Sequence, residues 1–168
     1  AVHPIAAVQN EYSLWSRNTE IGVLETCREL GAALVAFSPL ARGFLCDVLH
    51  DVSTLDAKDI RRAMPRFSPE NYARNLALLP AYKALAKEAG CTPAQLALAW
   101  LLSRGEHVIP IPGTTRLDHL HEDLQAEQVR LSPELVARVD AVINQRTVSG
   151  ARYGAQSSTE VDTEVFED

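Results

Sequence analysis

The chain lacks a long apolar run and a basic-then-apolar beginning. No segment approaches the roughly 20 apolar residues that a membrane-spanning helix needs, and the first residues do not have the pattern of a secretory signal peptide. With 168 residues, of which 46% are hydrophobic and 23% charged, the chain has the length and composition of one soluble globular domain with a real core. We therefore expect a cytoplasmic protein.

An excess of positive charge is also missing. Sixteen Lys and Arg stand against 22 Asp and Glu, which gives a net charge of −6. A protein without surplus cations gains little from releasing the counterions of nucleic acid or of an anionic membrane. Neither nucleic acid nor membrane is therefore expected as a partner, whereas a local arginine site for a small anion stays open.

Cysteine is scarce and shows no metal or disulfide spacing. The three cysteines, Cys27, Cys46 and Cys91, are far apart and outside any CxxC motif. We interpret them as reduced packing residues, in line with a reducing compartment. His119 and His121 are two residues apart, so they point to different sides of a helix and form no metal site. We expect no bound metal.

Apolar runs alternate with helical patterns along the chain, and no internal repeat occurs. The predicted buried strands are 4–12, 32–40 and 107–111, and the predicted helices are 18–31, 68–90 with an interruption near Pro80, 92–105, 116–126 and 132–145. Continuously apolar strands between helices are typical of a parallel sheet covered by helices. The edges of such a three-stranded sheet stay bare unless something pairs with them.

Signals for helix ends and loops support this organisation. Ser68, Thr92 and Ser132 each precede a proline, a strong helix start signal. Asn18 or Thr19 is expected to cap the first helix, and Gly31 to end it. Polar segment 41–67 is long enough to be a functional or a disordered loop. The small, polar and acidic tail 148–168 is predicted to be poorly ordered at its end.

The stretch "FSPLARGFL", residues 37–45, follows the second predicted strand. Ser38 offers a hydroxyl, Pro39 stiffens the exit of the strand, and Arg42 with Gly43 lets the backbone approach a ligand closely. Taken alone, the stretch is equally well interpreted as a turn with a solvated arginine. Gln9, near the end of the first strand, could pair with an amide on a ligand or be a satisfied buried polar group.

A second stretch, "IPGTTRLDHLHED" at 111–123, follows the third predicted strand. Gly113 permits a tight turn, and Arg116 lies where the next helix shows its free N–H groups. A helix N-terminus beside a guanidinium favours a phosphate dianion, although a threonine cap with a surface arginine explains the stretch taken alone. Two such loops after successive parallel strands resemble the phosphate site of a (β/α)₈ barrel. No GxGxxG or P-loop spacing occurs.

Three stretches taken together resemble one known family. The segments "VQNEYSLWSR", "LVAFSPLARGFL" and "VIPIPGTTRLDHLHED" are closely similar to the C-terminal part of the aldo-keto reductases. The most similar branch contains many bacterial reductases and the β subunits of potassium channels. The three motifs occur in the right order and at the right intervals. The resemblance implies an α/β fold in which residues 1–168 are the C-terminal portion of a (β/α)₈ TIM barrel, with strands 6, 7 and 8, their covering helices and a tail.

Carried over position by position, the resemblance implies a cleft for NADPH. Gln9 would bind the nicotinamide carboxamide, and Phe37 would stack on the nicotinamide ring. The residues that would run along the pyrophosphate and ribose are Ser38, Leu40, Arg42 and Gly43.

The resemblance also implies the residues for the adenosine end of NADPH. The residues that would hold the adenosine 2′-phosphate are Gly113, Thr114 and Arg116. Glu122 would contact the adenine edge. Arg116 would be the main cation of the phosphate clamp. Two positions depart from the family. Asp123 stands where the family commonly has asparagine, and His119 stands where some members have arginine. These departures imply a weaker adenine contact and a weaker or pH-sensitive clamp.

The catalytic set of the family is expected to lie outside this chain. Carbonyl reduction in the family uses a tyrosine acid whose pKa a lysine lowers, an aspartate paired to that lysine, and a histidine that polarises the carbonyl. Lys58, Lys83 and Lys87 are the three lysines, and none ends a predicted strand. Tyr12 follows the first strand without a lysine placed to activate it, so we interpret its ring as a packing group. We predict no catalytic residue in this chain.

The sequence therefore predicts the cofactor-binding portion of an NADPH-dependent oxidoreductase that reduces aldehydes or ketones to alcohols and is inactive as this chain alone. The partners of the complete enzyme would be a small carbonyl substrate and either the missing barrel half or a second copy. One alternative is a non-catalytic nucleotide-binding or interaction module whose bare sheet edges assemble with another chain. Another is a phosphate-binding barrel of a different family.

Overall fold

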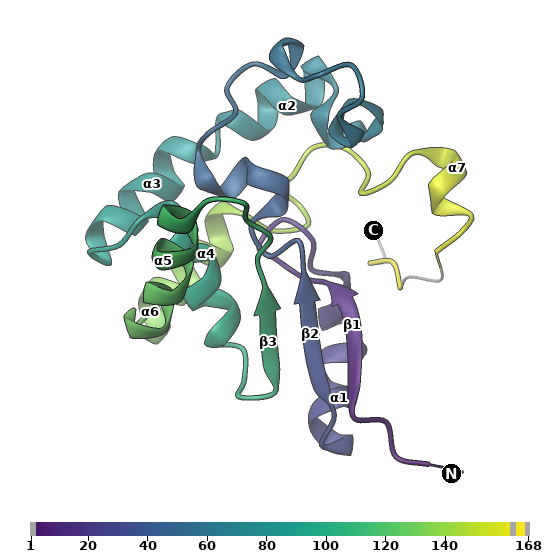
Figure 1. Ribbon diagram of the computed structural model, residues 1–168, viewed down its shortest axis with the longest axis vertical. Coiled ribbons are helices and arrows are strands. Elements are labelled where there is room, and N and C mark those ends of the chain that lie inside the picture. The colour runs from purple at the N-terminus through teal and green to yellow at the C-terminus, as the bar shows by residue number, and fades with distance from the viewer. Residues whose placement is uncertain (1–2, 162–163, 167–168) are drawn as a thin grey trace.

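Three parallel strands form the centre of the molecule. The computed structural model describes residues 3–161 and 164–166. Strands β1 (Ala7–Glu11), β2 (Ala33–Phe37) and β3 (Val108–Ile111) form one sheet in the order β1-β2-β3. All three run in the same direction, so their carboxyl ends lie together at one edge of the sheet (Figure 1). The predicted parallel sheet and its covering helices are confirmed.

The helices occupy the spaces between and beyond the strands. Their bounds are α1 (Val23–Leu30), α2 (Pro69–Leu76), α3 (Leu79–Glu88), α4 (Pro93–Leu102), α5 (Leu117–Gln125), α6 (Pro133–Val142) and α7 (Ala155–Ser158). Figure 1 shows α3, α4, α5 and α6 gathered on the β3 side of the sheet. Helix α4 packs against β3, α3 and α5 and is buried from Ala94 to Leu101, as its apolar sequence predicts. In the described part of the chain, no helix is long and apolar enough to cross a membrane.

The serine and threonine start signals work as predicted. The Ser68 and Ser132 hydroxyls accept hydrogen bonds from the Asn71 and Leu135 amides. Thr92 forms a reciprocal capping box with Gln95 at the start of α4. The break predicted near Pro80 is also present, because α2 ends at Leu76 and α3 begins at Leu79.

The start of α1 differs from the prediction. Residues Asn18–Glu20 form a separate 3₁₀ turn, and α1 begins after Gly22, with no side-chain cap. The Thr19 hydroxyl instead donates to the Glu11 carbonyl at 3.0 Å, so it holds the end of β1 rather than a helix terminus. The predicted stop is confirmed, since Gly31 has the left-handed φ of 67°.

Segment 41–67 is neither an open loop nor regular helix. It consists of short 3₁₀ helices at Ala41–Cys46, Val52–Thr54, Ile60–Ala63 and Pro65–Phe67. The buried side chains of Phe44, Leu45 and Phe67 attach the segment to the core. The tail beyond α6 also packs, because the Ser149 amide donates to Asn75 at 2.7 Å. The end of the tail, at 167–168, lies outside the described residues.

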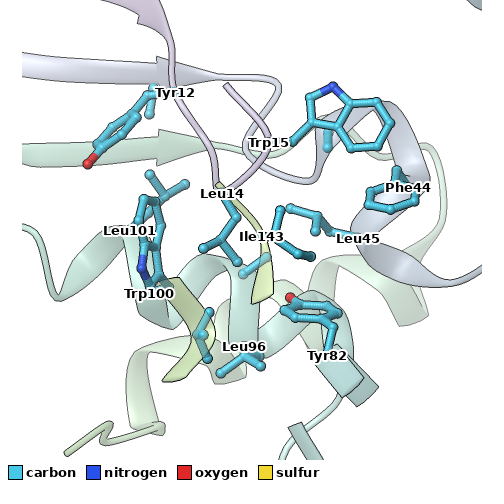
Figure 2. Close-up of a cluster of buried hydrophobic side chains, with 14 of the residues drawn as sticks. Tyr12, Leu14, Trp15, Phe44, Leu45, Tyr82, Leu96, Trp100, Leu101 and Ile143 are labelled. Atoms are coloured by element: carbon cyan, nitrogen blue, oxygen red, sulfur yellow. The ribbon is translucent and has the colours of Figure 1, made fainter. Parts of the chain in front are cut away.

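A core rich in aromatic side chains lies between the helices and the loops that follow the strands. Figure 2 shows Tyr12, Leu14, Trp100 and Ile143 grouped around the middle of this core, and all four are fully buried. The Trp100 ring meets Tyr12 edge-on at a centroid distance of 5.5 Å, and its indole N–H donates to Asp140 at 2.9 Å. This core therefore combines apolar packing with satisfied polar groups.

One face of the sheet is covered by helices and the other is largely uncovered. Leu34, Ala36 and Val108 point to the helices and are buried. On the opposite face, Ile109 and Ile111 are 48% and 42% exposed, and Gln9 is exposed as well. The prediction of fully buried strands is therefore wrong for these residues. Glu11, at the carboxyl end of the same face, is only 3% exposed because the pocket loop and the tail contact it.

The capping box of α4 predicts a measurable stability loss. Replacing Thr92 with alanine removes the hydroxyl that accepts from the Gln95 amide, and such cap losses typically cost about 1 kcal/mol. Urea denaturation should show this decrease in the free energy of unfolding. Thr26→Ala, at an exposed position inside α1, is the matched control and should not lower stability, because alanine is the better helix former. Equal stability of Thr92→Ala and the wild type would contradict the assignment.

Candidate functional site at the carboxyl ends of β2 and β3

A pocket of about 670 Å³ opens where β2 and β3 end. Its walls are the loops after these two strands and the beginnings of α4 and α5. Of the predicted cofactor residues, those that line it are Phe37, Ser38, Leu40, Arg42, Gly43, Gly113, Thr114, His119, Glu122 and Asp123. The tertiary structure thus brings together two stretches that lie far apart in the sequence.

The loop after β2 is built from unusual backbone conformations. Ser38, Ala41 and Arg42 have φ of 51°, 51° and 55°, and Gly43 has φ of 93°. Residues other than glycine adopt this left-handed region at a cost, so the surrounding structure must hold them there. Part of that support comes from the Gly43 amide, which donates to the Leu40 carbonyl at 3.0 Å. Arg61 donates to the Arg42 carbonyl at 3.1 Å.

Arg42 lines the pocket but already has an anionic partner. Its guanidinium donates to the Ser38 hydroxyl at 3.2 Å and to the Glu11 carboxylate at 3.1 Å. Glu11 is only 3% exposed. Burial acts to raise the pKa of this carboxyl, but the arginines Arg152 and Arg42 outweigh it and hold the pKa below its usual value. Arg42 is therefore held in the wall of the pocket by an ion pair with Glu11, which it shares with Arg152.

Gly113 has a different role from the one predicted. Its φ lies outside the left-handed region, and a Cβ built on it would meet nothing within 4 Å. The backbone after β3 therefore does not require glycine at this position. What Gly113 provides is open space beside the pocket.

Arg116 lies at the N-cap of α5, outside the pocket lining. The Thr114 hydroxyl accepts from the Arg116 amide at 3.1 Å. The guanidinium donates to Asp118 at 3.0 Å, and this exposed pair holds the pKa of Asp118 well below its usual value. The predicted phosphate cation thus faces the carboxylate of Asp118, the second residue of α5.

The wall formed by α5 is acidic. Glu122 and Asp123 line the pocket there beside Cys46. Burial raises the pKa of Asp123, and the neighbouring Glu122 adds to the effect while His119 opposes it. Burial and these two carboxylates raise the pKa of the Cys46 thiol to about 12, so the thiol is unreactive at neutral pH. This wall favours a hydrogen-bond donor on a ligand over a phosphate.

Gln95 holds this acidic wall against α4. Its side-chain amide donates to the Glu122 carbonyl at 3.1 Å and to Gln125 at 3.2 Å. Pro93 and Ala94, at the start of α4, form the adjacent part of the pocket. Thr92 and Pro93 mark a helix start in the sequence, but the place of Pro93 at the site arises only from the packing of α4 against α5.

Gln9 lies on the sheet beside the pocket without lining it. It is paired with Val35, and two positions further on Glu11 is paired with Phe37. Because alternate residues of a strand share a face, Gln9, Val35 and Phe37 all point to the uncovered side of the sheet. The structure therefore places Gln9 on the same face as Phe37 but leaves it exposed.

The tyrosine nearest to the strand ends has the environment of a core residue. The Tyr12 hydroxyl donates to Glu20 at 2.7 Å. Burial, with Glu20 nearby, raises the pKa of Tyr12 far above its usual value, the opposite of what a tyrosine acid needs. Lys83 pairs with Asp47. Within the described residues, no group of His, Cys, Asp or Glu could hold a metal ion.

Comparison with known proteins gives this geometry a context. The sequence model described as "Aldo/keto reductase family" matches residues 1–144. The glycerol dehydrogenase AKR11B4 from Gluconobacter oxydans is similar with a TM-score of 0.78 and 26% identity, over 84% of this chain and 43% of that one. The thermostable aldo-keto reductase Tm1743, solved with the inhibitor epalrestat, is similar with a TM-score of 0.58 and 30% identity, over 84% of this chain and 41% of that one.

The chain thus spans 43% and 41% of the length of these two structures. Its parallel sheet, the loops after β2 and β3 and the helices between them correspond to part of a (β/α)₈ barrel. From the match over residues 1–144 and these structural likenesses, we conclude that the chain belongs to the aldo/keto reductase family.

Proposed function

We propose that this chain is the NADPH-binding, C-terminal portion of an oxidoreductase that reduces aldehydes or ketones to alcohols. The pocket at the ends of β2 and β3 is the observation that carries the proposal, since the loops predicted to bind the cofactor form its walls. Its volume of about 670 Å³ is in the usual range for a small-molecule site. Membership of the aldo/keto reductase family supports a nicotinamide cofactor.

The residues present fit the parts of NADPH. Phe37 offers an apolar ring at the end of β2, and the open space beside Gly113 leaves room for a ligand near the first turn of α5. The N–H groups of that turn and the Thr114 hydroxyl favour a phosphate. The acidic wall at Glu122 and Asp123 favours the amino group of an adenine. When bound, the nicotinamide would supply the hydride for reduction.

Arg116 has to exchange its partner in this proposal. The Arg116–Asp118 pair is exposed, and exposed ion pairs contribute little to stability. A phosphate dianion at the N-terminus of α5 would gain both the guanidinium and the helix dipole. Arg116 would then turn from Asp118 toward the 2′-phosphate.

The proton-transfer groups of the reaction would come from outside this chain. The Tyr12 hydroxyl is engaged with Glu20, and Lys58, Lys83 and Lys87 are exposed. The proposal therefore treats residues 1–168 as strand 6 to helix 8 of a barrel with its tail. The other barrel half would complete the pocket and supply the carbonyl substrate site.

A second candidate, a non-catalytic interaction module, is favoured by the uncovered apolar surface. Ile109 and Ile111 on β3 are exposed, and Leu117, Leu120 and Leu124 form an exposed stripe at helical spacing along α5. Apolar surface of this kind typically marks an interface. Under this candidate, the chain would assemble with a second copy or another chain and would bind nucleotide without turnover.

Replacing Arg116 with alanine in the assembled enzyme should weaken NADPH far more than NADH. A lost charge-assisted contact costs roughly 1.5–3 kcal/mol, or about 10- to 100-fold in affinity, and only NADPH carries the 2′-phosphate. Calorimetric titration with both nucleotides gives the two dissociation constants. Arg130→Ala is the matched control, an exposed arginine outside the pocket lining. Equal weakening of NADPH and NADH would refute the clamp.

The chain by itself should consume no NADPH in the presence of a reactive aldehyde. This follows if the tyrosine, lysine, aspartate and histidine of the reaction lie on another segment. The measurement is the fall in absorbance of NADPH against a control without the chain. Light scattering gives the mass of the chain in solution, and urea denaturation shows whether it unfolds cooperatively. A monomer that unfolds cooperatively argues against an obligate interaction module. Turnover above the control would overturn the prediction.

A further inference from the structure

We propose that residues 150–153, named here the C-terminal latch, hold the pocket loop 38–46 in its binding shape through the buried carboxylate of Glu11. The inference deepens the proposed function, and it rests on that function only for the identity of the ligand. The latch lies beyond residues 1–144 that match the family, so it is an element of this chain outside the matched region.

One carboxylate connects the latch with the pocket loop. The Glu11 oxygen Oε2 accepts from Arg42 of the loop at 3.1 Å. The same oxygen accepts from Arg152 Nε at 3.0 Å and from the Tyr153 hydroxyl at 3.1 Å. Oε1 accepts from the Ser16 hydroxyl at 2.8 Å. One carboxylate oxygen, Oε2 of Glu11, therefore binds both the loop and the latch.

Burial makes this junction strong. The side chains of Glu11, Arg42 and Arg152 are 3%, 20% and 13% exposed. Removing one partner from a buried, hydrogen-bonded charge group is costly because it removes charge-assisted hydrogen bonds and opens the buried carboxylate to water. Without Arg152, Glu11 and Arg42 would lose the group that shares their oxygen and would gain access to water. The order of the latch thus affects the anchor of Arg42 directly.

The latch is itself seated by specific contacts. Arg66 donates to the Gly150 carbonyl at 3.2 Å and to the Trp15 carbonyl at 2.6 Å. Gly150 has φ of 93°, and a Cβ there would lie 3.0 Å from the Arg66 backbone. The Arg152 guanidinium lies 4.6 Å from the centre of the Tyr153 ring. These contacts fix the direction from which the latch reaches Glu11.

The pocket loop needs such an anchor because its backbone is strained. Arg42 combines a left-handed φ of 55° with a place in the pocket wall. Its side chain reaches back to Glu11, so the ion pair holds the strained turn in place. Docking of the latch consequently stabilises the conformation in which the pocket exists before any ligand arrives.

Hydrogen exchange without nucleotide tests the latch directly. In the assembled enzyme of the proposed function, Arg152→Ala should speed hydrogen exchange of the amides of Gly43, Leu45 and Asp47, which bond within or next to the loop. Loss of a charge-assisted contact predicts an increase of about 10-fold in the exchange rate of these amides. Arg138→Ala is the matched control, since Arg138 pairs with Glu88 on the surface, and it should leave these amides unchanged.

Tyr153→Phe and nucleotide binding complete the test. Tyr153→Phe removes a single hydroxyl and should speed hydrogen exchange of the same amides by a smaller factor. This variant keeps the test possible if Arg152→Ala does not fold. The dissociation constant and the KM of NADPH should rise about 5- to 10-fold in Arg152→Ala, with kcat at saturating NADPH unchanged. In a Glu11→Gln background, Arg152→Ala should add almost nothing, because both act through one carboxylate.

The outcomes separate the latch from the proposed function. Faster loop exchange in a protein that binds no NADPH supports the latch and removes the NADPH assignment. NADPH binding with loop exchange unchanged in both Arg152→Ala and Tyr153→Phe overturns the latch and leaves the assignment standing. Additive effects of Glu11→Gln and Arg152→Ala on affinity also overturn it.

Discussion

Parallel pairing of β2 with β3 is the constraint on which the rest of the structure depends. It brings Phe37 opposite Ile111, so two loops that are distant in the sequence leave the sheet at the same edge. A parallel connection requires a long crossover, and residues 38–107 supply it with 3₁₀ turns, α2, α3 and the buried helix α4. The start of α4 then closes the pocket between the two loops. The site is therefore a consequence of strand direction.

Hydrogen-bonded buried charge is the second organising feature. Among the described residues, no buried side-chain nitrogen or oxygen lacks a hydrogen-bond partner. Glu11 joins β1 to the pocket loop and the C-terminal latch, and Arg66 ties the same latch to the Trp15 carbonyl. Such groups are costly to bury alone and strongly directional when paired. These directional contacts fix the positions of the loops beyond the strands, whereas apolar packing alone does not specify those positions.

Local signals in the sequence predicted most of the elements, because their physical causes are local. A hydroxyl before a proline starts α2, α4 and α6, and Gly31 ends α1 in the left-handed region. The signal at Asn18 and Thr19 failed because a tertiary contact, from Thr19 to the Glu11 carbonyl, competes for the hydroxyl. At Gly113 the structure shows open space and no left-handed backbone, so a turn is not what glycine provides there. The importance of Glu11 could not be foreseen, because its partners Arg42 and Arg152 are distant in the sequence.

The sequence by itself determined the order of strands and most helices, the caps of α2, α4 and α6, and the family. These properties follow from periodicity, cap chemistry and short motifs, each of which is carried by neighbouring residues. The tertiary structure alone decided that Arg42 is bound to Glu11, that Arg116 faces Asp118, and that one face of the sheet is exposed along β3. Each of these depends on which side chains meet across the fold, and only packing brings those residues together.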